Sequence, residues 1–190
     1  MNHSPKYYLL TLLLICLPGA ADEWRSVPTS SQLNYAVDFQ GLPIEGQFKH
    51  FSVHYSATKN LLVTVDIGSA DMSDDELNSE IAGADWFDTE RFGKAVFSSD
   101  AIIKNSLSEG EFSAEGTLTL KGISQSVRVP FRWQQDSQQP NSASMMGQLV
   151  LQRSDFSIGI GDWSSGEQIG IDVSVSFSVL MQRQTEASTN

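Results

Sequence analysis

The chain has 190 residues, one cysteine and a formal net charge of −11, and 40% of its residues are hydrophobic. This length predicts a single domain. The acidic balance argues against nucleic acid or an anionic membrane as a main partner, because both recruit clustered Lys and Arg. The single cysteine, Cys16, excludes a disulfide within the chain.

Residues 1–21 have the three parts of a secretory signal peptide. Lys6 is followed by an apolar run, 7–17, that is too short to span a bilayer comfortably, and Gly19 and Ala21 are the small residues of a cleavage site. We therefore expect cleavage before Asp22, a periplasmic location and no stable membrane insertion. The alternatives are an uncleaved N-terminal anchor and a lipoprotein modified at Cys16.

Most of the remaining chain alternates apolar and polar residues with period two, which is typical of half-buried strands. A change of face near Lys49 predicts a bulge, and Pro130 is tolerable only at a sheet edge or a bulge. The expected strands cover 33–39, 48–55, 60–67, 95–103, 111–120, 127–133, 145–152 and 169–181.

One segment departs from this alternation. Residues 73–76 have the form of a capping box, with Ser73 as the N-cap and Glu76 as its partner, and Gly83 is placed to end a helix. The segment 84–99, ADWFDTERFGKAVFSS, then brings large aromatics together between this helix and the next strand. Because aromatic side chains have the largest apolar surfaces, we expect this connection to cover the interior of the domain.

The expected fold is all-β: a single antiparallel barrel of about eight strands, with one short helix inserted near residues 73–83. Closure into a barrel removes the exposed edges that an open antiparallel sheet would leave. The barrel domain would cover 22–182, and 183–190 would form a polar C-terminal tail. A barrel of this size is either filled by its own side chains or holds one ligand.

Four segments carry a resemblance to a known family: GQFKHF at 46–51, the aromatic segment 84–99, GTLTLKGIS at 116–124 and RSDF at 153–156. In this order and spacing they are similar to the signature segments of the YceI-like family. The resemblance implies an exported, lipocalin-like barrel, and some members of the family hold a polyisoprenoid chain in the barrel.

A ligand of this kind needs only an apolar cavity, since each buried CH₂ group gains about 0.8 kcal/mol. The alternative is that the same side chains fill the barrel as an ordinary core. For Arg153 we weigh a contact with a lipid head group against an ion pair with Asp155. The candidate wall consists of Phe51, Phe97, Leu118, Phe131, Trp133 and Phe177, with Trp86 and Phe87 as a lid.

The sequence offers no convincing catalytic nucleophile and base. His50 and His54 are too far apart along a strand to share one metal ion, so we expect no metal site and no cofactor other than a bound isoprenoid lipid or quinone. We predict an exported protein that holds a polyisoprenoid or a similar amphiphile, such as an isoprenoid quinone, a polyprenyl phosphate or a fatty amide, for transport, storage or sequestration. The alternatives are a ligand-free structural module of the cell envelope and an enzyme acting on a bound lipid; a homodimer is left open.

Overall fold

The computed structural model describes residues 23–56 and 60–184, so the expected signal peptide lies outside the described residues. These residues form one sheet of eleven strands and one α-helix, α1 (Asp75–Ala82). The strands are β1 (Trp24–Ser26), β2 (Gln32–Phe39), β3 (Leu42–Phe48), β4 (Phe51–Tyr55), β5 (Leu61–Asp66), β6 (Ala70–Asp71), β7 (Lys94–Lys104), β8 (Glu111–Leu120), β9 (Ile123–Gln135), β10 (Ser142–Gln152) and β11 (Ile169–Arg183). Short 3₁₀ turns lie at Pro28–Ser30, Ile67–Ser69, Arg153–Phe156 and Gly161–Trp163.

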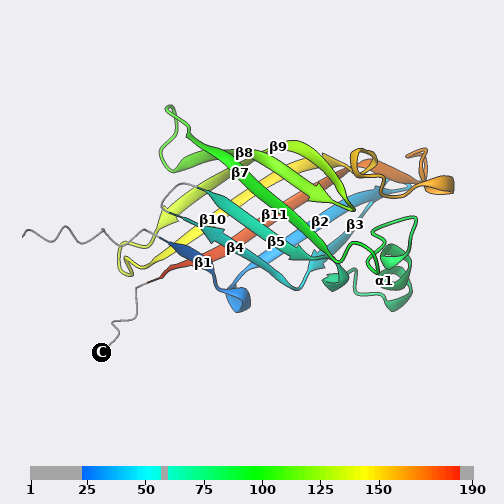
Figure 1. The fold of residues 1–190 in the computed structure, drawn as a ribbon, viewed down its shortest axis with the longest axis horizontal. Coiled ribbons are helices and arrows are strands. Elements are labelled where there is room, and N and C mark those ends of the chain that lie inside the picture. Colours follow the sequence, from blue (N-terminus) through cyan, green and yellow to red (C-terminus); the bar gives the residue numbers. More distant parts are fainter. Residues whose placement is uncertain (1–22, 57–59, 185–190) are drawn as a thin grey trace, which may run out of the picture.

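Eight of these strands close into an antiparallel barrel, in the order β1-β4-β5-β7-β8-β9-β10-β11 (Figure 1). Closure depends on β1, which pairs with β4 on one side and with the last residues of β11 on the other. The predicted closed barrel of eight strands is confirmed. The prediction did not include β1, because three residues are too few to show a period.

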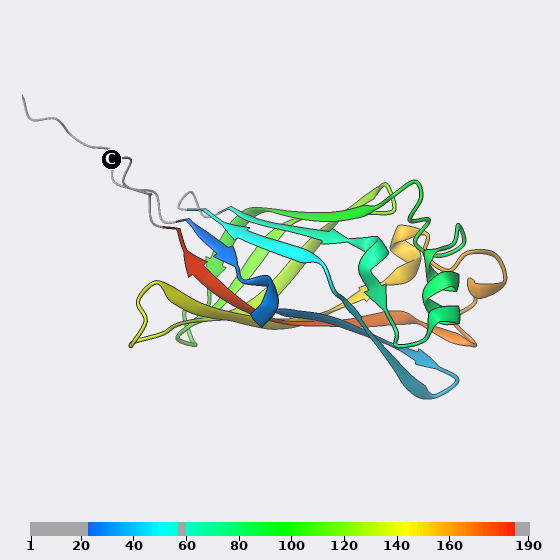
Figure 2. The same ribbon diagram turned by 90° about the horizontal axis from the view of Figure 1, so that it is seen from below.

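The chain breaks between β1 and β2 and between β3 and β4, and the sheet continues past the barrel beyond these breaks. Residues 27–31 separate β1 from β2, and Lys49 and His50 separate β3 from β4. The change of face near Lys49 is therefore a break between two strands. Beyond these breaks, β2 pairs with β11 from Ile169 to Ser178, and β3 followed by β6 pairs on the other side of β2. The extended sheet lies under α1 and the loops around it (Figure 2).

The wall of the barrel has a seam between β9 and β10. The strand β9 pairs with β8 along nearly its whole length, but pairs with β10 only over Phe131–Gln135. Pro130 comes directly before these paired residues, and its carbonyl oxygen faces Gly147 of β10. The N–H and C=O of a strand residue point to the same side, so the hydrogen bond that proline cannot donate would have been to β10. From their shared hairpin the two strands diverge toward the α1 end (Figure 2). Pro130 thus stands where β9 becomes an edge, as the sequence indicated.

The helix α1 lies at one end of the barrel (Figure 1). Its N-cap is Asp74, whose carboxylate accepts from the backbone N–H groups of Glu76 and Leu77, so the prediction of Ser73 was wrong. Ser73 has a φ of +59° and lies outside the helix. Gly83 ends the helix as expected. No helix in the described part of the chain has the length and apolar character needed to cross a bilayer.

Two groups of buried apolar residues form the core. The larger group fills the end of the barrel closed by β1 and includes Trp24, Val53, Phe97 and Met181. The smaller group comprises Trp86, Phe156 and Ile158, which lie between the loop after α1 and the loop after β10. Between these two groups the inward-facing side chains leave space.

Candidate functional site: an apolar cavity along the barrel

Three apolar cavities follow one another inside the barrel. The mouth cavity, beneath α1, has a volume of about 430 Å³; a central cavity and a far cavity have about 160 Å³ each. Phe48, Leu120, Leu151 and Val175 line both the mouth and the central cavities. Leu61 and Met145 line both the central and the far cavities. The shared residues show that the cavities meet end to end.

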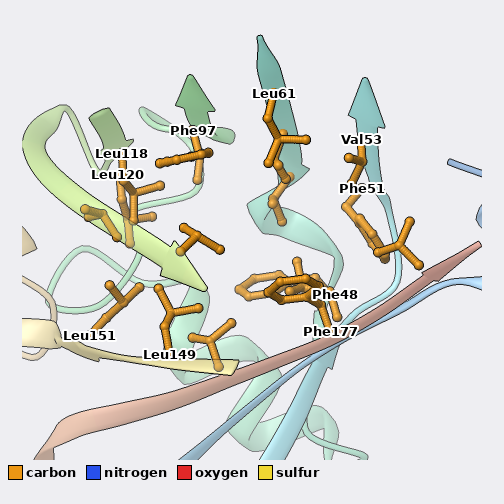
Figure 3. Close-up of a pocket in the computed structure, with 18 of the residues that line it drawn as sticks. Phe48, Phe51, Val53, Leu61, Phe97, Leu118, Leu120, Leu149, Leu151 and Phe177 are labelled. Carbon is orange, nitrogen blue, oxygen red and sulfur yellow. The ribbon is translucent and has the colours of Figure 1, made fainter. Parts of the chain in front are cut away.

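The central cavity is surrounded by strands on all sides. Side chains from β4, β5, β7, β8 and β10 point into it (Figure 3). The β10 wall runs from Met145 to Leu151, a length of about 20 Å at about 3.3 Å per residue. Four of the predicted wall residues line this cavity: Phe51, Phe97, Leu118 and Phe177.

Glycine keeps part of this interior open for an aromatic ring. Gly147 pairs with Phe177 across β10 and β11, and a Cβ at Gly147 would collide with the Phe177 ring and with the Pro130 carbonyl. The missing side chain therefore lets the ring of Phe177 lie across β10.

The mouth cavity is covered by α1 and the loop that follows it. Leu77 and Ile81 face it from the helix, and the predicted lid residues Trp86 and Phe87 line it from the loop. Trp86 is only 8% exposed. Its ring lies 5.9 Å from that of Trp163, between ring centres. The structure thus places both predicted lid residues over the mouth cavity; their part in holding a ligand stays a prediction.

Backbone contacts join this lid to the loop after β10. The carbonyl of Asp85 accepts from the N–H groups of Gly159 and Ile160, at 2.8 and 3.0 Å. Lys121, in the turn between β8 and β9, donates to the carbonyls of Ala84 and Ser157 at 2.9 and 2.8 Å. The two loops therefore form one cover over the mouth cavity.

Arg153 organises the loop after β10. The residue is 3% exposed, and its five N–H donors all reach backbone carbonyls, at 2.6 to 2.9 Å. The acceptors belong to Ile158, Gly159, Trp163, Ile169 and Gly170. Burial away from water lowers the pKa of the guanidinium from its ordinary value.

Neither sequence-based interpretation of Arg153 included this arrangement. The proposed ion pair with Asp155 was wrong, because no carboxylate of the described residues lies within salt-bridge distance of the guanidinium. Arg153 does line the mouth cavity. Contact with a head group stays a prediction, and it would require the guanidinium to release carbonyls that it now binds.

Phe131 and Trp133 pack in the same core cluster as the other predicted wall residues but line neither the mouth nor the central cavity. Both line the far cavity, where Trp133 packs edge-on against Trp24 with ring centres 5.1 Å apart. The ring of Phe131 stacks on Phe112 at 5.5 Å. These aromatics close the end of the barrel opposite α1, so the structure divides the predicted wall between two regions.

Sequence reasoning missed several residues of the cavity. Phe48, Leu149 and Leu151 follow the same alternation as the residues that were chosen, and only the pairing of strands shows which of them face the open space. Tyr35 lines the mouth cavity, and its hydroxyl has no hydrogen-bond partner among the described residues. Burial, and then the nearby charge of Asp71, raise the pKa of Tyr35.

The two histidines contact different carboxylates. His54 lies 3.5 Å from the Glu23 carboxylate, and His50 lies 4.0 Å from that of Asp66. Within residues 23–56 and 60–184, no three His, Cys, Asp or Glu side chains are grouped to hold a metal ion.

Together these features define a class of protein: a small, closed antiparallel barrel with an elongated apolar cavity covered at one end by a helix and two loops. Within that class, the chain belongs to the YceI-like family, whose domain model matches residues 24–181.

Individual relatives agree with this assignment. A UPF0312 protein of Vibrio vulnificus is 27% identical over 167 residues, which cover 80% of this chain and 87% of the relative. The crystal structure of Burkholderia cenocepacia BcnA is similar with a TM-score of 0.75 and 28% identity, over 82% of this chain and 98% of BcnA. A polyisoprenoid binding domain from Saccharophagus degradans, implicated in plant cell wall breakdown, has the same fold, with a TM-score of 0.69 at 16% identity over 85% of this chain and 98% of that domain.

Proposed function

We propose that this protein binds a polyisoprenoid or a similar long-chain amphiphile inside the barrel and carries, stores or sequesters it without chemical change. The observation that carries the proposal is the run of apolar cavities beneath the lid. The mouth cavity alone, at about 430 Å³, falls within the range of about 300–1,000 Å³ typical of small-molecule sites. The polyisoprenoid binding domain of similar fold supports the choice of ligand.

The energetics favour a long chain over a compact ligand. Each CH₂ group transferred from water gains about 0.8 kcal/mol, so a chain that follows the 20 Å wall of β10 gains affinity along its whole length. No polar contact is needed for such binding, and the lining side chains of the central cavity are all apolar. This arrangement suits ligands that share a tail and differ in their head groups.

The test begins with protein purified gently from cells that express the full-length gene. Organic extracts analysed by mass spectrometry should contain a long-chain lipid in near-stoichiometric amount, and delipidated protein should take up added isoprenoid quinone. If neither occurs, the barrel is a ligand-free module and the binding proposal fails.

We also propose that the protein works in the periplasm, on the basis of the signal-like residues 1–21. The mature protein should then begin at Asp22 and appear in the periplasmic fraction. A mass that includes residues 1–21, or retention in the membrane fraction, would contradict this location.

A further inference from the structure

Two buried donors in the lining of the mouth cavity have no hydrogen-bond partner. They are the hydroxyl of Tyr35, on β2, and the indole N–H of Trp86, on the loop after α1. The two residues are only 9% and 8% exposed, and neither polar atom bonds to a described residue. Most buried donors in proteins are paired, because an unpaired one costs stability. Two unpaired donors in the wall of one cavity therefore point to an acceptor that comes from outside the chain.

The Tyr35 hydroxyl lies on the inner face of β3. Tyr35 pairs with Gly46 across β2 and β3, and a Cβ at Gly46 would collide with the ring and the hydroxyl of Tyr35. Ile44 and Phe48, two residues to either side of Gly46, line the mouth cavity, so the hydroxyl lies within its wall. Burial, and then the nearby charge of Asp71, raise the pKa of Tyr35, so the hydroxyl keeps its proton and remains a donor at neutral pH.

The indole of Trp86 is held by one face and one edge. The Arg153 guanidinium lies over the ring, and the edge at Cζ3 faces Gly159. The edge that carries Nε1 is on the opposite side of the ring and has no polar partner among the described residues. Because an indole has a donor and no acceptor, only an acceptor atom can pair with it.

The cavities differ in what they offer to a polar group. All the side chains that line the central cavity are apolar. In the mouth cavity, backbone carbonyls already occupy the five donors of Arg153, whereas those of Tyr35 and Trp86 are unpaired. An amphiphile therefore meets unpaired donors beneath the lid and apolar contacts further along the barrel.

We propose that Tyr35 and Trp86 donate hydrogen bonds to the polar head group of the ligand, so that the head lies beneath the lid and the tail extends along the central cavity. The ligand class is then an amphiphile with an acceptor oxygen, such as a carbonyl or a hydroxyl, at one end. The inference rests on the proposed function, because it concerns the ligand of the same cavity. Apolar contacts still supply most of the affinity, and the two donors add orientation.

The test uses Tyr35→Phe, which removes the hydroxyl and keeps the ring. The two ligands are phytone, a branched isoprenoid ketone, and the hydrocarbon in which a CH₂ group replaces its carbonyl group. Each would displace the apolar probe diphenylhexatriene from delipidated protein. We expect Tyr35→Phe to lower the affinity for phytone about three- to tenfold, the usual contribution of one hydrogen bond, and to leave the affinity for the hydrocarbon unchanged.

Thermal unfolding of the ligand-free protein separates a ligand contact from a structural role. Tyr35→Phe removes an unpaired buried hydroxyl, so the thermal midpoint should rise by about 2–4 °C while the affinity for phytone falls. A lower midpoint would show that the hydroxyl is bonded within the protein and would overturn its assignment to the ligand. Thr117→Val, which removes an exposed hydroxyl from β8, should change neither the midpoint nor the two affinities.

Trp86 has a separate readout, the proton resonance of its indole N–H, which a spectrum of Trp86→Phe would assign. A new hydrogen bond moves this resonance downfield, so phytone should shift it further than the hydrocarbon does. The same position with both ligands would show that Trp86 does not bind the head group.

The outcomes distinguish this inference from the proposed function. If the unmodified protein binds both ligands and Tyr35→Phe changes neither affinity, or changes both equally, the barrel binds lipids and the assignment of the donors is wrong. If the unmodified protein takes up neither ligand nor the probe, the proposed function itself fails.

Discussion

The guanidinium carbon of Arg153 lies 5.6 Å from the centre of the Trp86 ring. Arg153 binds three carbonyls of the loop after β10 and two at the start of β11, and Trp86 belongs to the loop after α1, so this contact joins the two halves of the cover. Gly159, with a φ of +70°, lies against both side chains, and a Cβ there would collide with the guanidinium. The cover over the mouth cavity is therefore built around one buried cation.

Replacing Arg153 by Lys should loosen the cover. Lysine has three donors and no planar fork, so at least two of the five carbonyls would lose their partner. With each unpaired buried group costing about 1–3 kcal/mol, we expect a loss of about 2 kcal/mol or more. Hydrogen exchange should accelerate over residues 153–170, and the thermal midpoint should fall.

A matched control is Arg128→Lys on the outer face of β9. Arg128 pairs with Glu115 at the surface, where such pairs contribute about 0–1 kcal/mol. Equal losses in the two variants would mean that the carbonyl contacts of Arg153 add no more stability than a surface ion pair.

The two lid residues should behave differently when each is replaced by Ala. Phe87 is half-buried and lines the mouth cavity, with its ring 6.0 Å from that of Phe48, so Phe87→Ala should weaken lipid retention by about fivefold or more with a small loss of stability. Trp86 packs on Phe156 and Ile158, so Trp86→Ala should also destabilise the cover, by about 3 kcal/mol.

Dissociation of a fluorescent lipid and urea unfolding would measure the two effects separately. Leu107→Ala, at a side chain 94% exposed on the β7–β8 loop, is a suitable control. Unchanged lipid release from Phe87→Ala would show that this side chain does not contact the ligand.

The alternation of residues was enough to predict the class of fold. It marked most of the long strands and the inward faces of Phe51, Phe97 and Phe177, because each of these strands has one face toward the interior. It did not show β9 starting at Ile123, because the half-buried position between Ile123 and Val127 is the polar Gln125, which breaks the alternation.

The site was harder to predict because it depends on relations between distant segments. Trp133 and Phe177 have the same sequence signal, yet one packs on Trp24 at the closed end and the other lines the central cavity. Only the register between strands distinguishes them. The role of Arg153 likewise depends on the conformation of residues 158–170, which no local pattern specifies.

Leu151→Trp should obstruct the passage between the mouth and central cavities. Leu151 lines both, so a larger side chain there would occupy the space where they meet. We expect affinity for a long-chain prenol to fall at least about tenfold and affinity for a short-chain alcohol to change little. Overpacking would cost about 1–3 kcal/mol of stability.

The neighbouring residue provides the control for this variant. Val150 is 59% exposed on the outer face of β10, so Val150→Trp adds the same side chain outside the barrel and should leave both affinities unchanged. If Leu151→Trp still binds the long prenol as the unmodified protein does, the two cavities are not occupied by one chain.

Asp71 should make the stability of the protein depend on pH in acid. Hydrogen bonds from Lys49, Asn78 and the N–H of Ser73 lower the pKa of Asp71 from 3.8 to about 2. The unfolded chain therefore binds more protons at this group between these two values, so its contribution to stability is complete above pH 3.8 and is lost as the pH falls through about 2. Asn78 lies on α1, so protonation of Asp71 also weakens a hydrogen bond that ties the helix to β6.

Urea unfolding between pH 2 and 5 should show a smaller acid-induced loss of stability in Asp71→Asn than in the unmodified protein. The loss in Lys49→Met should be intermediate, because this variant removes the first cause of the lowered pKa. Identical pH profiles for all three proteins would show that this carboxylate does not couple folding to pH.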